Sequence, residues 1–178
     1  MRIGVPTEIK NHEYRVGATP DGVRELVAAG HGVLVQAGAG AAVGYADSHY
    51  LDAGARIVGD ARAVYECELV IKVKEPQPAE FALTHPGQIL YCYQHFAPDP
   101  MLLDAMIERG VACVAYETVT APDGSLPLLI PMSQIAGRLA PQFGAWALKM
   151  ANGGGGVQFT VSSSGSGTVT MNLASIPS

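Results

Sequence analysis

The sequence alternates short apolar runs with segments of helical periodicity, and this alternation most limits what it can fold into. Each apolar run is bounded by Gly, Pro or charge, as expected of a strand buried on both faces. We predict strands at residues 2–6, 32–36, 69–73, 88–93 and 112–116. We predict helices at residues 19–29, 47–53, 60–67 and 99–109. Alternation at this spacing predicts an α/β fold, a parallel sheet flanked by helices in the Rossmann-like or flavodoxin-like manner.

Capping residues mark the ends of two of these predicted helices. Thr19 and Asp99 are each followed directly by proline, the order expected at a helix N-cap and first helical position. Gly30 and Gly110 come just after the last periodic residue, where glycine commonly ends a helix. We therefore expect these four residues to bound two helices.

The C-terminal part of the sequence has a different character. A helical pattern runs over 132–150, with apolar side chains at spacings of four, four and three: Ile135, Leu139, Phe143 and Trp146. No charged residue occurs after Lys149, where Gly, Ser and Thr dominate. We predict an α/β domain over 1–131, a helix over 132–150 and an irregular tail over 151–178, with one extended segment at 157–161. The tail has the composition of a linker, a cloning remnant or foreign sequence.

Composition excludes several classes of function. Eleven Lys and Arg against sixteen Asp and Glu give a net charge of −5, which disfavours a basic nucleic-acid-binding face. No apolar run approaches the roughly 20 residues of a membrane span, and the N-terminus shows no secretion signal. Three cysteines without C-x-x-C spacing and five scattered histidines favour neither a disulfide framework nor a metal site. We expect a soluble cytoplasmic protein whose ligand is a small molecule.

Polar residues interrupt or end several of the apolar runs. Arg15 follows the first strand and has the donor geometry to bind a carboxylate bidentately, although an arginine in such a segment is more often a solvated residue of a surface loop. Lys72 and Lys74 close the strand at 69–73, on one side of it, and parallel sheets place their ligands at such carboxyl ends. Buried lysines are rare without a partner, so these two are either functional or structurally paired.

Two further segments carry candidate groups. Tyr91, Tyr93 and His95 alternate at the end of the strand at 88–93 and therefore share one face. An imidazole there is suited to acid–base chemistry near neutral pH, or to a structural role. Residues 131–133 open the last predicted helix, whose first amide groups are able to face a ligand.

Taken together, these segments resemble the N-terminal part of the alanine dehydrogenase/pyridine nucleotide transhydrogenase family. The motifs that carry the resemblance occur in this order: M-R-I-G-V-P-T-E-I-K-N-H-E-Y-R-V, V-K-E-P-Q-P, Y-Q-H, A-Y-E-T-V and L-P-L-L-I-P-M-S-Q-I-A-G-R-L-A. The similarity runs from Met1 to about Gly156. The transhydrogenase counterpart of Y-Q-H lacks the histidine, so His95 favours the alanine dehydrogenase branch.

The resemblance implies a site for pyruvate or L-alanine. Arg15 and Lys74 would hold the carboxylate and the carbonyl oxygen, and His95 would be the acid/base partner at the reacting carbon. Tyr93 and Met132 would line the pocket. We expect no metal at this site.

The resemblance also implies NAD as the cofactor of the complete enzyme, with Met132 and Ser133 towards the nicotinamide. In the family a Rossmann domain follows this region, whereas residues 165–170 here read G-S-G-T-V-T and lack the third glycine. We expect the substrate-binding domain of an NAD-dependent L-alanine dehydrogenase, truncated, inactive alone and homo-oligomeric through its last helix. The alternative is a non-enzymatic module that binds small carboxylates or another protein.

Overall fold

The structure is a computed structural model that describes residues 1–149, 153, 158–163 and 169–174. Its internal contacts divide the chain into two units, Met1–Val119 and Thr120–Ser178. This division falls after Val119, earlier in the chain than the domain end at residue 131 that the sequence pattern suggested. Each unit is described by itself below.

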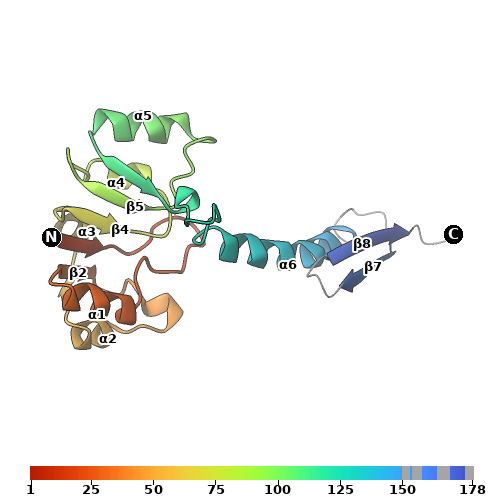
Figure 1. Cartoon of the computed structure of the whole chain (residues 1–178), viewed down its shortest axis with the longest axis horizontal. Coiled ribbons are helices and arrows are strands. Elements are labelled where there is room, and N and C mark those ends of the chain that lie inside the picture. Colours follow the sequence, from red (N-terminus) through yellow and green to blue (C-terminus); the bar gives the residue numbers. More distant parts are fainter. Residues whose placement is uncertain (150–152, 154–157, 164–168, 175–178) are drawn as a thin grey trace. The chain divides into compact units, whose positions relative to one another are not determined.

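A six-stranded parallel sheet forms the centre of the first unit (Figure 1). Its strands are β1 (Arg2–Val5), β2 (Gly32–Gln36), β3 (Arg56–Val58), β4 (Leu69–Ile71), β5 (Ile89–Cys92) and β6 (Ala112–Ala115). They lie in the order β3-β2-β1-β4-β5-β6, so the chain reverses its direction of winding between β1 and β4. The predicted parallel sheet is confirmed, with five strands found within two residues of the expected bounds. The three-residue edge strand β3 was not predicted.

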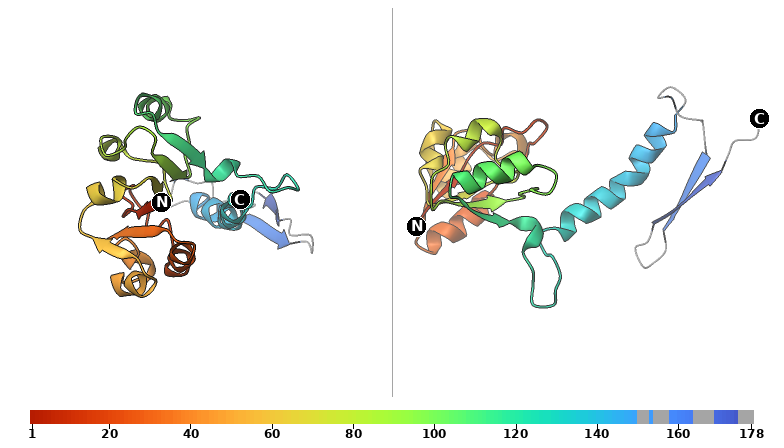
Figure 2. Two further views of the ribbon diagram at one scale, coloured as in Figure 1. Left: turned by 60° about the vertical axis from the view of Figure 1, so that its left-hand side comes forward. Right: turned by 90° about the horizontal axis from the view of Figure 1, so that it is seen from above.

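Helices cover both faces of this sheet (Figure 2). They are α1 (Pro20–Ala28), α2 (Asp47–Asp52), α3 (Ala61–Tyr65), α4 (Pro78–Phe81) and α5 (Pro100–Glu108), with two short 3₁₀ turns at Ala41–Val43 and Tyr116–Thr118. The expected caps are confirmed, since Thr19 accepts a hydrogen bond from the Gly22 amide and Asp99 from the Leu102 amide. Gly30 and Gly110 adopt the positive φ values that end α1 and α5. The single turn of α4 was not predicted.

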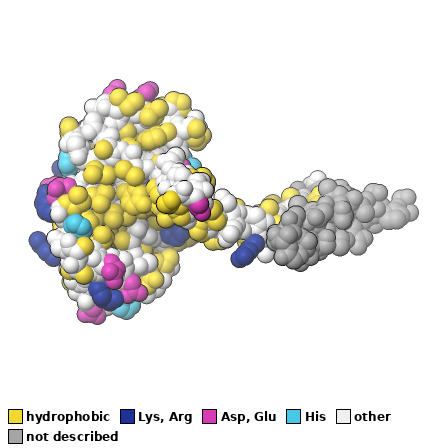
Figure 3. All heavy atoms as spheres, in the orientation of Figure 1, with side chains coloured by type: hydrophobic (Ala, Val, Ile, Leu, Met, Phe, Trp, Pro, Cys, Tyr) yellow, Lys and Arg dark blue, Asp and Glu magenta, His cyan; other side chains and the backbone are white. Residues whose placement is uncertain are grey.

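The core of the first unit consists of two apolar clusters. One joins β1 and β2 to α1 and α2 through Ile3, Val5, Val33, Val35, Val23 and Tyr50. The other joins β4 and β5 to α3 and α5 through Val70, Leu90, Tyr65, Leu102 and Met106. All three cysteines are free thiols, and Cys67 and Cys92 are buried. On the face drawn in Figure 3, Lys and Arg side chains lie beside Asp and Glu around the rim of this unit.

The second unit contains one long helix and a pair of strands. Helix α6 (Ile130–Ala147) begins two residues before the predicted start, and its apolar residues Ile135, Leu139, Phe143 and Trp146 are exposed. Strands β7 (Gln158–Ser163) and β8 (Val169–Ala174) pair antiparallel, where the sequence suggested one extended segment in an irregular tail. The missed signal is the alternation of Val169, Met171 and Leu173. None of the described helices is long and apolar enough to cross a membrane.

Glycine at position 4 is required by the close approach of β1 to α3. A Cβ atom there would lie 2.4 Å from the backbone oxygen of Val64 and 2.7 Å from its Cγ1 atom, whereas one at Gly32 on β2 would meet nothing within 4 Å. We expect Gly4→Ala to lower the free energy of unfolding by about 1–3 kcal/mol through overpacking. Gly32→Ala is the matched control and should leave stability nearly unchanged. Chemical denaturation measures both, and equal stabilities would contradict the packing argument.

Candidate active site

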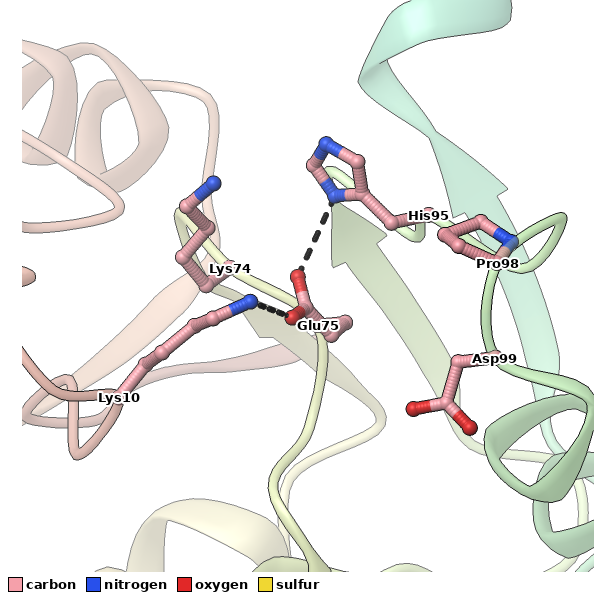
Figure 4. A pocket seen from close by; sticks show the side chains of 6 residues that line it. All are labelled: Lys10, Lys74, Glu75, His95, Pro98 and Asp99. Atoms are coloured by element: carbon pink, nitrogen blue, oxygen red, sulfur yellow. Dashed lines mark hydrogen bonds and ion pairs between the residues drawn. The ribbon is translucent and has the colours of Figure 1, made fainter.

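A cavity of about 290 Å³ opens at the carboxyl ends of β4 and β5. Its lining residues are Lys10, Lys74, Glu75, His95, Pro98 and Asp99 (Figure 4). These residues come from the segments that follow β1, β4 and β5. The sheet order makes those strands neighbours, so the cavity lies beside the point where the winding reverses, where open α/β sheets bind their ligands.

The two lysines at the end of β4 have different environments. Lys72 is 1% exposed, and its Nζ atom lies 2.7 Å from Glu80 Oε1 and 3.4 Å from Glu8 Oε2. The hydroxyl of Tyr65 also donates a hydrogen bond to Glu80 Oε1, at 2.9 Å. Lys74, in contrast, is half-buried and lines the cavity. Lys72 is therefore a structural residue, and Lys74 is the one positioned to meet a ligand.

Glu8 ties this buried cluster to the segment that carries Lys74. Its Oε1 atom accepts a hydrogen bond from the Val73 amide at 2.6 Å, while its Oε2 atom is buried and makes no hydrogen bond within the described residues. Burial raises the pKa of Glu8 above its ordinary value, although the charge of Lys72 and the Val73 amide act in the opposite direction. Two carboxylates therefore share one ammonium here, and the pKa of Glu8 is raised by its burial.

Arg15 already binds a carboxylate bidentately, and that carboxylate belongs to this chain. Its Nε atom donates to Glu13 Oε1 at 2.8 Å, and its Nη2 atom donates to Glu13 Oε2 at 2.5 Å. Hydrogen bonding from Arg15 lowers the pKa of Glu13 despite partial burial, and the charge of Lys74 acts in the same direction. The guanidinium is thus fixed in place by Glu13, near Lys74 but outside the set of cavity-lining residues.

Tyr93 belongs to an aromatic cluster beside these charges. The rings of Tyr91 and Tyr93 both meet Tyr116 edge to face, with centroids 4.3 Å and 5.1 Å apart. Burial raises the pKa of Tyr93, and the positive charge of Arg15 opposes that effect. The two tyrosines share one face, as the alternation predicted, and Arg15 lies within electrostatic range of Tyr93.

His95 follows β5 and projects into the cavity from an unusual backbone conformation. Its φ is 49°, in the left-handed region that residues other than glycine seldom adopt. The amides of Gln94 and His95 both donate to Glu117, at 3.0 Å and 2.9 Å. The Nδ1 atom of the ring lies 3.2 Å from Glu75 Oε2, an ion pair drawn in Figure 4.

Met132 and Ser133 belong to the second unit, in the first turn of α6. Met132 is half-buried and Ser133 is exposed. The backbone amides of Ile130 and Ser133 donate to the carbonyls of Leu126 and Leu129. Those two amides are therefore engaged within the chain, contrary to the expectation of free amides at this helix start.

Two site residues, Glu75 and Glu117, were not among the candidates predicted from the sequence. Glu75 is next to Lys74, and Glu117 lies in the 3₁₀ turn that follows β6, in A-Y-E-T-V. Applying the carboxyl-end rule to every strand would have found both. In the part of the chain that the structure describes, no three His, Cys, Asp or Glu side chains are grouped as a metal site requires.

The fold and the cavity define an α/β ligand-binding domain with a doubly wound sheet. More particularly, the chain belongs to the family described as alanine dehydrogenase/PNT, N-terminal domain, whose model matches residues 4–136. The alanine dehydrogenase of Halomonas elongata is 51% identical over 158 residues, and that of Mycobacterium tuberculosis strain CDC 1551 is 50% identical over 158 residues. Each match covers 88% of this chain and 43% of the relative, so the chain spans less than half of either relative's length.

Solved structures give the same result. An L-alanine dehydrogenase superposes with a TM-score of 0.78 and 50% identity, covering 88% of this chain and 44% of that one. A transhydrogenase from Sinorhizobium meliloti superposes with a TM-score of 0.63 and 26% identity, covering 66% of this chain and 35% of that one. The predicted fold and family are confirmed.

Replacing Lys72 tests its structural role. Lys72→Met leaves Glu8 and Glu80 buried without their counter-charge, and we expect the free energy of unfolding to fall by about 3–5 kcal/mol. Lys74→Met is the matched control, because Lys74 is half-buried and forms no ion pair within the described residues. The free energy of unfolding of this variant should fall by less than about 1 kcal/mol. Chemical denaturation at neutral pH compares them, and equal losses would refute the distinction between the two lysines.

The raised pKa of Glu8 makes stability depend on pH with a definite sign. The folded state holds the proton of Glu8 more tightly than the unfolded chain does. The contribution of this proton to the free energy of unfolding is therefore fully present below about pH 4.5, and it is lost as the pH rises through the raised pKa. Glu8→Gln keeps the acceptor for the Val73 amide and cannot ionise. We expect the stability of the wild type relative to Glu8→Gln to fall as the pH rises above about 4.5. Unfolding curves over a series of pH values measure it, and a constant or rising difference would contradict the raised pKa.

Proposed function

We propose that this chain is the substrate-binding domain of an NAD-dependent L-alanine dehydrogenase. The complete enzyme would convert L-alanine, NAD and water into pyruvate, ammonium and NADH. The observation that carries the proposal is the cavity at the carboxyl ends of two neighbouring strands, which both Lys74 and His95 line, with Arg15 and Tyr93 close by. A similarity of about 50% to alanine dehydrogenases supports the choice of substrate.

The charges near the cavity suit a small α-keto acid. Lys10 is paired with Glu75 and Arg15 with Glu13, whereas Lys74 forms no ion pair in the described part of the chain. We assign the carboxylate and carbonyl oxygen of pyruvate to Lys74 and Arg15, because charge-assisted hydrogen bonds are the strongest this site can offer. Tyr93 and Met132 complete the lining in this proposal. A cation held in advance by a carboxylate needs little rearrangement when the ligand arrives.

His95 is the residue suited to proton transfer. In the direction of alanine oxidation, a base must take a proton from the water or amine that reacts at the α-carbon, and an imidazole titrates in the appropriate pH range. Its ring lines the cavity together with Lys74. We propose that His95 returns this proton when pyruvate is reduced, so that one side chain serves both directions.

NAD is the cofactor that we propose for the complete enzyme, where it accepts the hydride. The described residues do not fit a dinucleotide. The sequence contains no G-x-G-x-x-G motif, and the amide of Ser133 is engaged with Leu129. A contact from Ser133 to the nicotinamide would therefore use its hydroxyl group. Most of the G-S-G-T-V-T segment lies outside the described residues.

The exposed apolar residues of α6 support a further part of the proposal, that the protein acts as a homo-oligomer. Ile135, Leu139, Phe143 and Trp146 are between 39% and 67% exposed. A row of apolar side chains of this kind is typical of a protein interface. We place the enzyme in the cytoplasm, where L-alanine and NAD are both at hand.

Pyruvate binding tests the proposed site. We expect Arg15→Ala and Lys74→Met each to weaken pyruvate binding at least about tenfold, because each removes a charge-assisted hydrogen bond. Arg24→Ala is the matched control, since Arg24 is an arginine of α1 that is paired with Asp21 at 2.5 Å and does not line the cavity. Isothermal titration calorimetry with pyruvate measures all three. An unchanged affinity in Arg15→Ala would remove Arg15 from the site.

A further inference from the structure

We propose that Glu75 is a positioning residue for His95, which it holds in the tautomer with the proton on Nδ1. The Nε2 atom is then left with the lone pair that proton transfer requires. Glu117 completes the arrangement by holding the backbone of the same histidine. The inference rests on the proposed function, in which His95 is the acid/base group, but the tautomer can be measured without any substrate.

One carboxylate oxygen of Glu75 faces the ammonium of Lys10, and the other faces the imidazole of His95. Glu75 Oε2 lies 3.2 Å from His95 Nδ1, and Glu75 Oε1 contacts the ammonium of Lys10. The side chain of Glu75 is only 9% exposed, whereas that of His95 is 46% exposed. In Figure 4 the second ring nitrogen points away from Glu75. The ring is thus held along one edge and open along the other.

Glu75 can act here only as a hydrogen-bond acceptor. Burial by itself would raise its pKa, but the hydrogen bond and charge of Lys10, together with His95, outweigh burial and lower the pKa below its ordinary value. Glu75 is therefore ionised at neutral pH and has no proton to donate. Glu75 Oε2 is buried, lies 3.2 Å from His95 Nδ1 and has no other hydrogen-bond partner within the described residues. Because a neutral imidazole has one N–H and one bare nitrogen, this unpartnered acceptor favours the tautomer with the N–H on Nδ1.

The backbone of His95 is fixed by a different carboxylate. A φ of 49° is costly for a residue with a side chain, and such conformations persist only where the surroundings enforce them. Glu117 accepts hydrogen bonds from the amides of Gln94 and His95, at 3.0 Å and 2.9 Å. Two carboxylates, one from the segment after β4 and one from the 3₁₀ turn after β6, thus hold one histidine, Glu75 at its ring and Glu117 at its backbone.

The tautomer has a direct consequence for the chemistry. When Nε2 takes up a proton from a group in the cavity, the ring becomes a cation with N–H groups on both nitrogens. Glu75 keeps its negative charge and continues to accept from Nδ1, so it stabilises the cation without itself being protonated. A histidine with its proton on Nε2 would present a donor to the cavity and would be unable to act as the base.

Nitrogen-15 NMR of the full chain, labelled at histidine, tests the proposal. At a pH where the imidazoles are neutral, we expect His95 to show a protonated-type shift at Nδ1 and a bare-nitrogen shift at Nε2. In Glu75→Gln the amide can either accept from or donate to Nδ1, so the two shifts should move towards each other. The spectrum of His95→Asn lacks the His95 resonances, and its comparison with the wild type therefore assigns them among the five histidines.

Two controls keep the outcome decisive. Glu108→Gln removes an exposed carboxylate of α5 that does not line the cavity, and it should leave the His95 shifts unchanged. Glu75→Asp keeps a carboxylate and should retain more of the Nδ1–H form than Glu75→Gln does. A wild-type spectrum with the proton on Nε2, or an unchanged spectrum in Glu75→Gln, would overturn the proposal. Either result is independent of pyruvate binding, whose failure would instead count against the proposed function.

Discussion

The burial of Lys72 is the constraint on which the rest of this structure depends. An ammonium group on a side chain that is 1% exposed is tolerated only when carboxylates lie against it. Glu8, which precedes Lys72 in the chain, and Glu80, which follows it, supply these carboxylates. Glu8 lies in the segment after β1, and Lys72 begins the segment after β4. These ion pairs therefore link the two segments that supply the cations of the site. The hydrogen bond from the Val73 amide to Glu8 adds a second link, at the residue before Lys74.

The sheet order explains why these segments meet at all. β1 and β4 are neighbours although more than sixty residues separate them, because the chain first winds outward through β2 and β3 and then crosses back. The segments after β1 and β4 therefore lie at the same edge of the sheet, and both contribute lining residues to the cavity. Arg15, Lys74 and His95 follow three adjacent strands, and the topology brings their segments to one edge of the sheet.

Much of the fold follows from sequence pattern, and the exceptions have physical reasons. The long apolar runs and the Thr19 and Asp99 caps are local signals, so they predicted the central strands and the two best-formed helices. β3 has only three residues and α4 a single turn, too short for any periodicity to appear. In the site, their positions at the ends of predicted strands identified Lys74 and His95 as candidates. The partner of Arg15 and the separate environments of Lys72 and Lys74 depend on side-chain packing across distant segments, which local pattern does not encode.

The pairing of charges near the cavity also limits what the site can bind. Glu13 occupies one edge of Arg15, and Glu75 holds Lys10 and His95, so each of these groups has a fixed position before any ligand enters. Moving such a group would expose a partly buried carboxylate without its partner, which is costly. A ligand must therefore match the positions of the donors as they stand. For the proposed function, fixed donors around a cavity of about 290 Å³ would favour a small, compact acid over a larger one that would require the pairs to separate.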